Sequence, residues 1–166
     1  MKVAKNGRKD NLNELEIFLH NNKLDVTPSN YMQIALWYNG YIVRKANPSK
    51  DKKSNTYQKR LEHSYQRSLR VVQLYCYVNN INNKLGYIYI ISNPAFPGWF
   101  KVGAAKDAET RLNTYQTYSP FRDYVLEYYK LVDNYELKEK EILSSFSSRN
   151  NEWIHAPLEE IIACVA

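Results

Sequence analysis

The residue types that could do chemistry are concentrated between Gly86 and Arg111. Tyr87 and Tyr89 lie in one apolar, aromatic run, Lys101 lies in the next, and Arg111 follows shortly after. A guanidinium group is always charged and can fork onto the oxygens of a phosphate. A tyrosine, whose pKa is normally about 10, can take a proton from water only if a neighbouring cation stabilises its phenolate. These side chains therefore have the types needed for attack on a phosphate ester.

Two strands and the start of a helix would hold these groups. The runs LGYIYIIS and GWFKVG flank a loop that contains Asn93, Pro94, Pro97 and Gly98, which is the pattern of two strands joined by a loop. A helix is expected to begin after Asp107, with Arg111 in its first turn.

The rest of this half predicts a third strand and two further helices. The third strand covers residues 124–132, and Asp133 or Asn134 would cap the helix that follows it. Residues 149–154 would end that helix and form a short extended piece. Pro157 would open a last helix over residues 158–165, which is apolar enough to pack on a sheet.

The first half of the chain predicts helices. Asp10 or Asn11 can cap a helix that ends near Asn22, and residues 57–78 form a longer candidate with a buried stripe at helical spacing. Residues 46–56 are polar and charged, which is typical of a linker.

A shorter helix would lie between these two. Thr27 would be its N-cap, with proline at the first helical position, and Asn39-Gly40 would stop it. Together with the first helix it could form a helix-turn-helix that turns Tyr31 and Gln33 to a DNA groove. The alternative is a helical hairpin that only covers a core.

The net positive charge belongs almost wholly to the first half. Residues 1–83 contain 14 Lys and Arg against 6 Asp and Glu, a balance of +8, whereas residues 84–166 contain 9 against 11, a balance of −2. Arg60, His63, Arg67 and Arg70 recur at spacings of three and four and so share one helix face, which phosphates of a nucleic acid could neutralise. The alternative is a solvated face. The candidate nucleic-acid contacts are Arg60, His63, Arg67, Arg70, Lys52 and Lys53.

Other classes of protein are disfavoured by composition. Cys76 and Cys164 each lie in an apolar context without metal-type spacing, which indicates reduced cysteines and not a disulfide framework. No run approaches the length of a membrane span, and the basic N-terminus lacks the apolar core of a signal peptide. We therefore expect a soluble protein of the cytoplasm, without membrane partners.

The second half resembles the GIY-YIG nuclease superfamily. The resemblance rests on the order GYIYI, a Pro/Gly loop, KVG, an arginine on the next helix, a helix of form E-K-x-I-x-x-x-F, and a late E-W pair. It covers about residues 84–156 and, more narrowly, resembles the phage and bacterial branch whose second motif is K-I-G or K-V-G. The resemblance implies a small α/β (α+β) domain with a three-stranded antiparallel sheet flanked by helices. It also implies hydrolysis of phosphodiesters with one divalent metal, Mg²⁺ or Mn²⁺, in the cytoplasm of a bacterium or of a phage-infected host.

The resemblance also implies roles for single residues. Tyr89 matches the tyrosine of the first motif, Lys101 stands where many members have the second motif's tyrosine, and Arg111 matches the family arginine. Tyr89 would be the general base for water, with Lys101 lowering its pKa, orienting the water or acting as the base itself. Tyr87 could be a second participant or a wall of the site. A carboxylate can hold Mg²⁺ while the ion keeps most of its waters, and Glu139 matches the metal-binding glutamate.

Some matches have competitors. Glu136 and Glu141 compete with Glu139 for the metal ligand, and Asn150 competes with Asn151 for the family's late asparagine. Residues 1–83 would form a basic helical nucleic-acid-binding region and residues 84–166 the catalytic domain.

These features predict a metal-dependent DNA endonuclease, as a monomer or a homodimer. RNA stays open as a substrate. The rival hypothesis is a non-cleaving nucleic-acid-binding protein that keeps the nuclease fold, and the lysine in the second motif favours it.

Overall fold

The chain divides into two compact units, with the division between Asn83 and Lys84. The structure is a computed structural model that describes residues 7–166, with side chains from Leu12 onward. Each unit has its own core, and each is described by itself.

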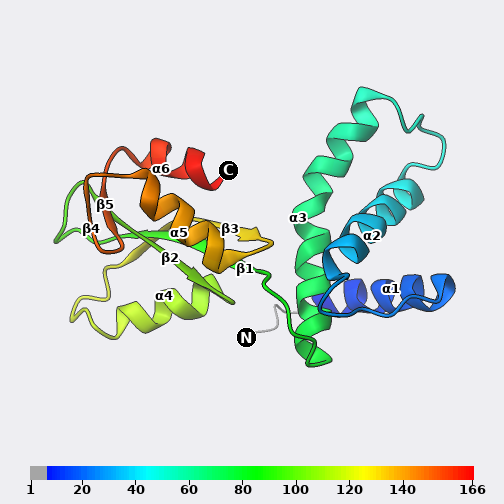
Figure 1. The fold of residues 1–166 in the computed structure, drawn as a ribbon, viewed down its shortest axis with the longest axis horizontal. Coiled ribbons are helices and arrows are strands. Elements are labelled where there is room, and N and C mark those ends of the chain that lie inside the picture. Colours follow the sequence, from blue (N-terminus) through cyan, green and yellow to red (C-terminus); the bar gives the residue numbers. More distant parts are fainter. Residues whose placement is uncertain (1–6) are drawn as a thin grey trace. The chain divides into compact units, whose positions relative to one another are not determined.

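The first unit consists of three helices, α1 (Gly7–Asn22), α2 (Tyr31–Ala46) and α3 (Asn55–Val78). Both α1 and α2 pack against α3, the longest helix, as the blue-to-green part of Figure 1 shows. Aromatic rings fill part of the core, since Phe18 lies 5.7 Å from Tyr38 between ring centroids. The Ser54 hydroxyl caps α3 by accepting a hydrogen bond from the N–H of Tyr57.

The predicted bounds of α2 are wrong at both ends. The helix begins at Tyr31 and not at Pro28, because the side chain of Asn30 organises a turn before it, accepting from the N–H of Thr27 at 2.8 Å. It also continues through Gly40 to Ala46. Asn39 does not end the helix because its side chain is buried and fully engaged by α3.

Asn39 is the polar centre of the α2–α3 contact. Its amide donates to the carbonyl of Leu61 at 2.9 Å, and its carbonyl oxygen accepts from the hydroxyls of Ser64 and Ser68. A buried amide needs such partners, because a lost hydrogen bond in the core costs about 1–3 kcal/mol. The residue that suggests a helix stop in the sequence therefore joins two helices in the structure.

The second unit is a mixed α/β fold, as predicted. Its sheet is antiparallel and has two short strands more than the expected three, in the order β3-β1-β2-β5-β4. The elements are β1 (Gly86–Ser92), β2 (Trp99–Ala105), α4 (Ala108–Gln116), β3 (Val125–Val132), α5 (Tyr135–Ser145), β4 (Arg149–Asn150), β5 (Trp153–His155) and α6 (Leu158–Val165).

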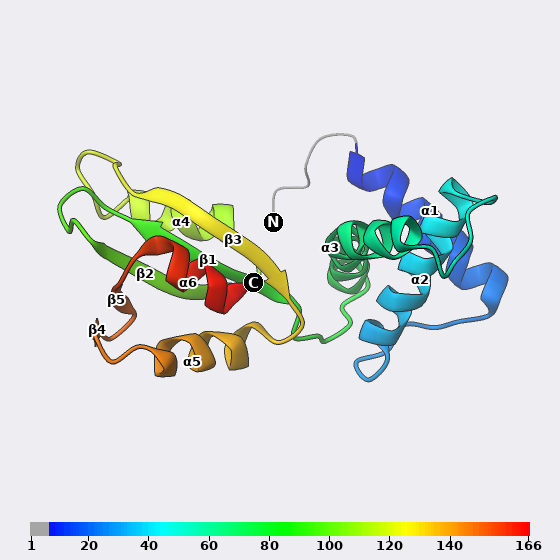
Figure 2. The same cartoon turned by 90° about the horizontal axis from the view of Figure 1, so that it is seen from above.

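The two faces of this sheet carry different layers. Ile88 and Ile90 of β1 belong to a core with residues of α5 and α6, whereas Tyr89 and Ile91 belong to a second core with α4. This follows from the alternation of side chains along a strand. Figure 1 shows α4 on one side of the sheet and α6 on the other, and Figure 2 shows α5 across the sheet from α4.

A close contact between β1 and β2 fixes the position of Tyr89. Tyr89 pairs with Gly103 in the register of the two strands, and its buried ring lies directly over that glycine. A Cβ atom at position 103 would overlap the ring and hydroxyl of Tyr89. The absence of a side chain at the glycine of the KVG run therefore leaves the space that the Tyr89 ring occupies.

We expect the substitution Gly103→Ala to destabilise the protein by about 1–3 kcal/mol, the usual cost of overpacking a core. Urea unfolding followed by circular dichroism would measure it. Gly40→Ala is the control, because a Cβ there meets nothing within 4 Å and alanine in a helix interior should stabilise by about 0.5–1 kcal/mol. Equal stability of Gly103→Ala and the wild type would show that Tyr89 does not need this space.

Candidate active site

The candidate site lies where α4 and α5 reach the same edge of β2 from opposite faces of the sheet. β5 pairs with β2 from Trp99 to Lys101, and the N–H of Val102 donates to the carbonyl of Glu152 at 2.9 Å. β2 continues to Ala105, beyond the end of β5. α4 comes to this edge with Arg111, and α5 comes to it with Glu139.

Tyr115 of α4 is the centre of the aromatic part of the site. It lies one helical turn after Arg111, so the two side chains share a face. Its hydroxyl is 3.3 Å from the hydroxyl of Tyr89, and its ring lies 5.5 Å from the Lys101 Nζ and 5.6 Å from the Arg111 Cζ. Tyr115 was not among the site residues predicted from the sequence. The arginine four residues before it was the available signal.

Lys101 forms an ion pair with Glu152, and its ammonium group donates a hydrogen bond to Oε2 of that glutamate. The lysine side chain is only 12% exposed, whereas that of Glu152 is 47% exposed. The pair joins β2 to the turn before β5. Glu152 appeared in the sequence only as part of the E-W pair, because its partner lies 51 positions earlier in the chain.

Tyr89 is buried and protonated in this arrangement. Burial and the hydrogen bond with Tyr115 raise the pKa of the Tyr89 phenol well above its ordinary value, while Arg111 lowers it. Reciprocally, the contacts with Tyr89 and Tyr115 raise the pKa of Arg111, which stays charged. The cation that acts on Tyr89 is therefore Arg111, whereas Lys101 acts on Tyr115 and Glu152.

Glu139 is half-buried on α5 and lies among charges of both signs. Burial and the carboxylate of Glu152 raise the pKa of Glu139 above the ordinary value. A hydrogen bond with the backbone of Ala104 lowers this pKa, and so do the positive charges of Lys101 and Arg111. Partial desolvation and repulsion by a second carboxylate favour the protonated form of Glu139, and a bound cation would favour its charged form. This donor set suits Mg²⁺, which binds through one or two carboxylates and completes its shell with water and phosphate oxygens.

The remaining predicted residues lie at different places in the second unit. The Tyr87 ring packs on Tyr129 of β3 with centroids 5.9 Å apart, on the same sheet face as Tyr89. Asn151 is exposed in the turn between β4 and β5, with a φ of 53°, a conformation that asparagine tolerates better than most residues. Glu136 and Glu141 are exposed on α5, unlike Glu139.

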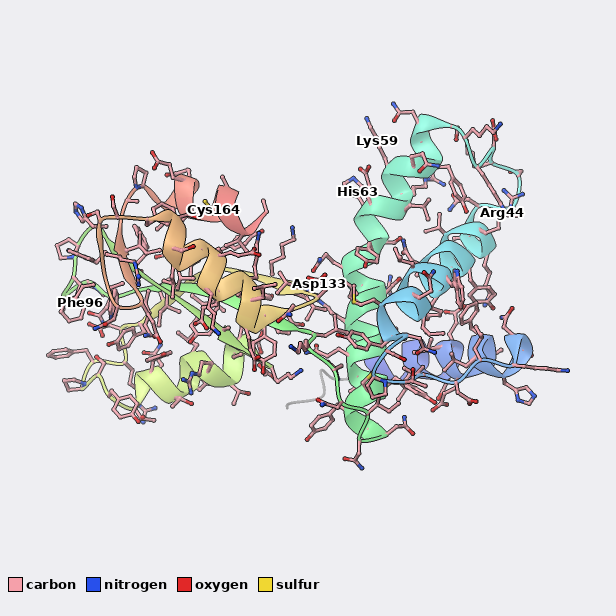
Figure 3. All side chains as sticks on the ribbon, viewed as in Figure 1. Arg44, Lys59, His63, Phe96, Asp133 and Cys164 are labelled. Atoms are coloured by element: carbon pink, nitrogen blue, oxygen red, sulfur yellow. The ribbon has the colours of Figure 1, made fainter. Side chains whose placement is uncertain are left out.

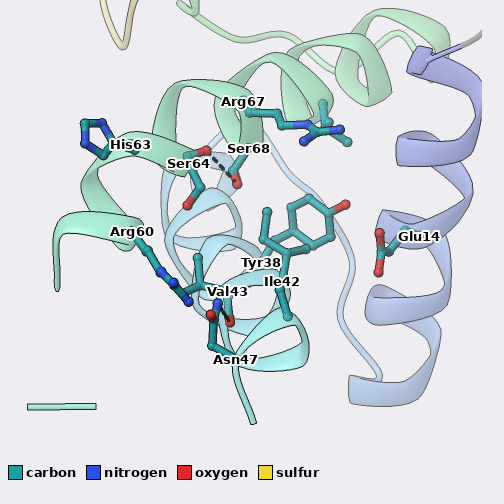
Figure 4. Close-up of a pocket in the computed structure, with 12 residues that line it drawn as sticks. Glu14, Tyr38, Ile42, Val43, Asn47, Arg60, His63, Ser64, Arg67 and Ser68 are labelled. Carbon is teal, nitrogen blue, oxygen red and sulfur yellow. Dashed lines mark hydrogen bonds between the residues drawn. The ribbon is translucent and has the colours of Figure 1, made fainter. Parts of the chain in front are cut away.

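The predicted nucleic-acid contacts lie at the surface of the first unit. Lys52 and Lys53 are exposed in the loop between α2 and α3, and Arg70 is exposed on α3. Arg60, His63 and Arg67 line a hollow of about 470 Å³ between α2 and α3 that also contains Tyr38 and Glu14. Figure 4 shows this hollow, and Figure 3 shows His63 at the surface of α3.

The described residues contain neither a cluster of metal ligands nor a membrane-spanning helix. Among the residues that the structure describes, no three His, Cys, Asp or Glu side chains are grouped as a metal site. Both cysteines are free, with Cys76 buried. Within residues 7–166, no helix is long and apolar enough to cross a bilayer.

The pKa of Glu139 leads to a stability prediction. The pKa of Glu139 is higher in the folded than in the unfolded chain, so the native state binds more protons between these two pKa values. The stabilisation from the protonated form is complete below the unfolded pKa and is lost as pH rises through the folded pKa. Glu139→Gln should therefore melt at a higher temperature than the wild type at pH 7. The difference should vanish below the ordinary glutamate pKa of about 4.3. A variant that melts lower at pH 7 would mean that Lys101 and Arg111 outweigh burial and Glu152.

Comparison with known proteins bears on the second unit. Residues 86–166 match the family model of the T5orf172 domain. Neither the curated proteins nor the solved structures gave a significant match. The match does not extend by itself to the GIY-YIG superfamily, so that finer resemblance stays a prediction. Residues 86–166 of this chain are thus similar to the T5orf172 domain family, and every residue of the candidate active site lies inside the similar region.

Proposed function

We propose that the protein is a metal-dependent DNA endonuclease whose second unit hydrolyses phosphodiester bonds by a one-metal mechanism of the GIY-YIG type. The observation that carries the proposal is the convergence of Tyr89, Lys101, Arg111 and Glu139, from β1, β2, α4 and α5, around one strand edge. The match to the T5orf172 domain supports a nuclease or DNA-binding role in general terms.

Glu139 would hold the divalent ion, Mg²⁺ or Mn²⁺. Such an ion lowers the pKa of bound water and stabilises charge on phosphoryl oxygens. The chain itself provides a half-buried carboxylate held by the backbone of Ala104. Glu152 lies close enough to raise the pKa of Glu139, so the two carboxylates together attract a cation.

Arg111 would bind the scissile phosphate. Its guanidinium group lies beside the rings of Tyr115 and Tyr89 at the same strand edge, and it remains charged at any accessible pH. A planar fork of donors suits two phosphate oxygens at once. Stacking on Tyr115 limits the rotamers of the arginine, so less entropy is lost when the phosphate binds.

Tyr89 would take the proton of the attacking water. In the free protein its phenol is protonated, because burial raises its pKa. It can act as a base only when further positive charge reaches the site. Its hydrogen bond with Tyr115 offers a route by which the phenol proton can move to the surface, since Tyr115 is only half-buried.

Lys101 would act by position and charge. Its ion pair with Glu152 neutralises the negative charge of that carboxylate next to Glu139. The positive charge of Lys101 also lowers the pKa of Glu139. These contacts favour a tuning role over the role of a second base.

The first unit would grip the DNA. Its exposed arginines on α3 and the lysines of the preceding loop give positive charge to one side of a long helix. Contacts of this type bind phosphates without regard to sequence. The strong imbalance of charge between the halves, +8 against −2, agrees with a division between grip and chemistry.

The rival function is nucleic-acid binding without cleavage. The raised pKa of Tyr89 favours it, since a buried phenol far from titration is a poor base. The half-buried Glu139 carboxylate favours cleavage, because a metal-dependent reaction needs an acidic group of this kind beside the cation that binds the phosphate.

Cleavage is the direct test. We expect the wild type to cut plasmid DNA in Mg²⁺ or Mn²⁺, and Glu139→Gln and Arg111→Ala to lower the rate by about 100-fold or more, as when a charge-stabilising group is lost. Tyr89→Phe should also stop cutting while DNA binding, measured by anisotropy, stays close to that of the wild type.

The matched controls for this assay are Glu136→Gln and Glu141→Gln, which change exposed carboxylates of the same helix and should keep the rate. An inactive wild type, or a Glu139→Gln variant that cuts normally, would sink the proposal in favour of the non-cleaving alternative. RNA offered beside DNA would identify the preferred substrate.

DNA binding by the first unit can be tested through the salt dependence of the affinity. If Arg67 contacts a phosphate, Arg67→Ala should reduce the slope of log affinity against log salt by about 1. Anisotropy of a labelled duplex at several salt concentrations would measure it. Lys23→Ala removes an equal charge from the loop after α1 and should leave the slope unchanged. Equal slopes for both variants would mean that this face of α3 does not touch DNA.

A further inference from the structure

An aromatic hollow lies beside the candidate active site. Its volume is about 220 Å³, and it is lined by Phe96, Trp99, Asn150 and Trp153. These residues come from the β1–β2 loop, the start of β2, β4 and β5. The hollow is smaller than the roughly 300–1,000 Å³ of sites for drug-sized ligands, so it suits a single ring system.

The strand register places this hollow on the catalytic face of the sheet. Phe100 and Ile154 pair with each other and belong to the core on the α5 and α6 side. Their neighbours Trp99 and Trp153 therefore face the α4 side, where Lys101 contacts Tyr115. Lys101 pairs directly with Trp153. Same-face residues along a strand are about 7 Å apart, so the hollow lies within about one nucleotide of the Lys101 position in the candidate active site.

The walls are aromatic rings outside both cores of the unit, with Phe96 exposed and Trp99 and Trp153 half-buried. Phe96 is 48% exposed and meets the Trp153 ring edge-on, with centroids 5.4 Å apart. Figure 3 labels Phe96 on the loop between β1 and β2. Asn150 adds the one amide, which can both donate and accept. Rings for stacking and an amide for a base edge are the usual means of binding an unpaired nucleobase.

The loop that carries Phe96 is held in place before any ligand binds. Asn93 is buried, donates to Asp123 at 2.9 Å and accepts from the N–H of Ala95 at 2.9 Å. The ring of Trp99 is supported by His155, with centroids 5.1 Å apart. A prearranged site loses less entropy on binding.

We propose that this hollow binds one unpaired nucleobase of the DNA next to the phosphate to be cut. The proposal rests on the proposed nuclease function and adds a substrate class to it. The protein would act on single-stranded DNA, or on duplexes in which a base is mismatched or otherwise easily unstacked at that position, because such a base costs least to extrude.

Tryptophan fluorescence can test base binding without cleavage. The chain has three tryptophans, and in a Trp37→Phe background the two that remain both line the hollow. Oligothymidylate should quench their emission. An abasic strand with the same number of phosphates should quench at least about 10-fold more weakly, since stacking on one ring system is lost.

Phe96→Leu in the same background removes one wall and leaves both reporters. It should weaken binding of the oligothymidylate about 10-fold. Phe121→Leu is the matched control, because Phe121 is 83% exposed in the same unit and does not line the hollow. Circular dichroism would verify that both variants are folded.

The proposal would be overturned by equal quenching by the abasic strand, or by equal binding of oligothymidylate to the Phe96→Leu and Phe121→Leu variants. Absence of quenching by either strand would also overturn it, and would leave the hollow to a protein partner. Glu139→Gln separates this proposal from the proposed function, because it should abolish cutting and keep the quenching. If the wild type does not cut DNA but shows base-dependent quenching, the hollow binds a base and the proposed nuclease function is wrong.

Discussion

The arrangement of the second unit depends on the contact between the Tyr89 ring and Gly103. The Tyr89 ring lies over β2 in a position that a Cβ atom at residue 103 would overlap, so this placement requires a glycine there. That contact directs the hydroxyl toward α4, where it meets Tyr115. Tyr115 in turn has both cations of the site at its ring. A single missing Cβ thereby positions a phenol, an arginine and a lysine together.

Local signals predicted much of this unit. Asp107 and Asn134 cap α4 and α5 by accepting from the N–H of Thr110 and Leu137, and such caps are visible in sequence. The pairing of Lys101 with Glu152 and the place of Tyr115 could not be found this way, because they depend on contacts between segments far apart in the chain. The short strands β4 and β5 were expected only as an extended piece, since β5 pairs with the distant strand β2 and β4 pairs only with β5.

The errors in the first unit have the same cause. Thr27-Pro28 and Asn39-Gly40 carry correct local propensities for a helix start and a helix stop. In each case a side-chain contact outweighs the local propensity. The Asn30 side chain accepts from the N–H of Thr27 and holds a turn there, and Asn39 is hydrogen-bonded to α3. Glycine inside α2 costs about 1 kcal/mol, which is comparable to one good hydrogen bond. Three hydrogen bonds to Asn39 outweigh it, and the helix continues.

The charges of the candidate site balance only while it is free of ligand. Lys101 and Arg111 offset the carboxylates of Glu139 and Glu152. A phosphodiester at Arg111 would add a negative charge to a half-buried place where charges are screened less than in water. Burial has already raised the pKa of Glu139, so the site has little capacity for more negative charge. A divalent cation at Glu139 would remove this excess and add the positive charge that the buried Tyr89 phenol needs before it can lose its proton. One divalent cation at Glu139 would therefore stabilise the carboxylate, the bound phosphate and the Tyr89 phenolate together.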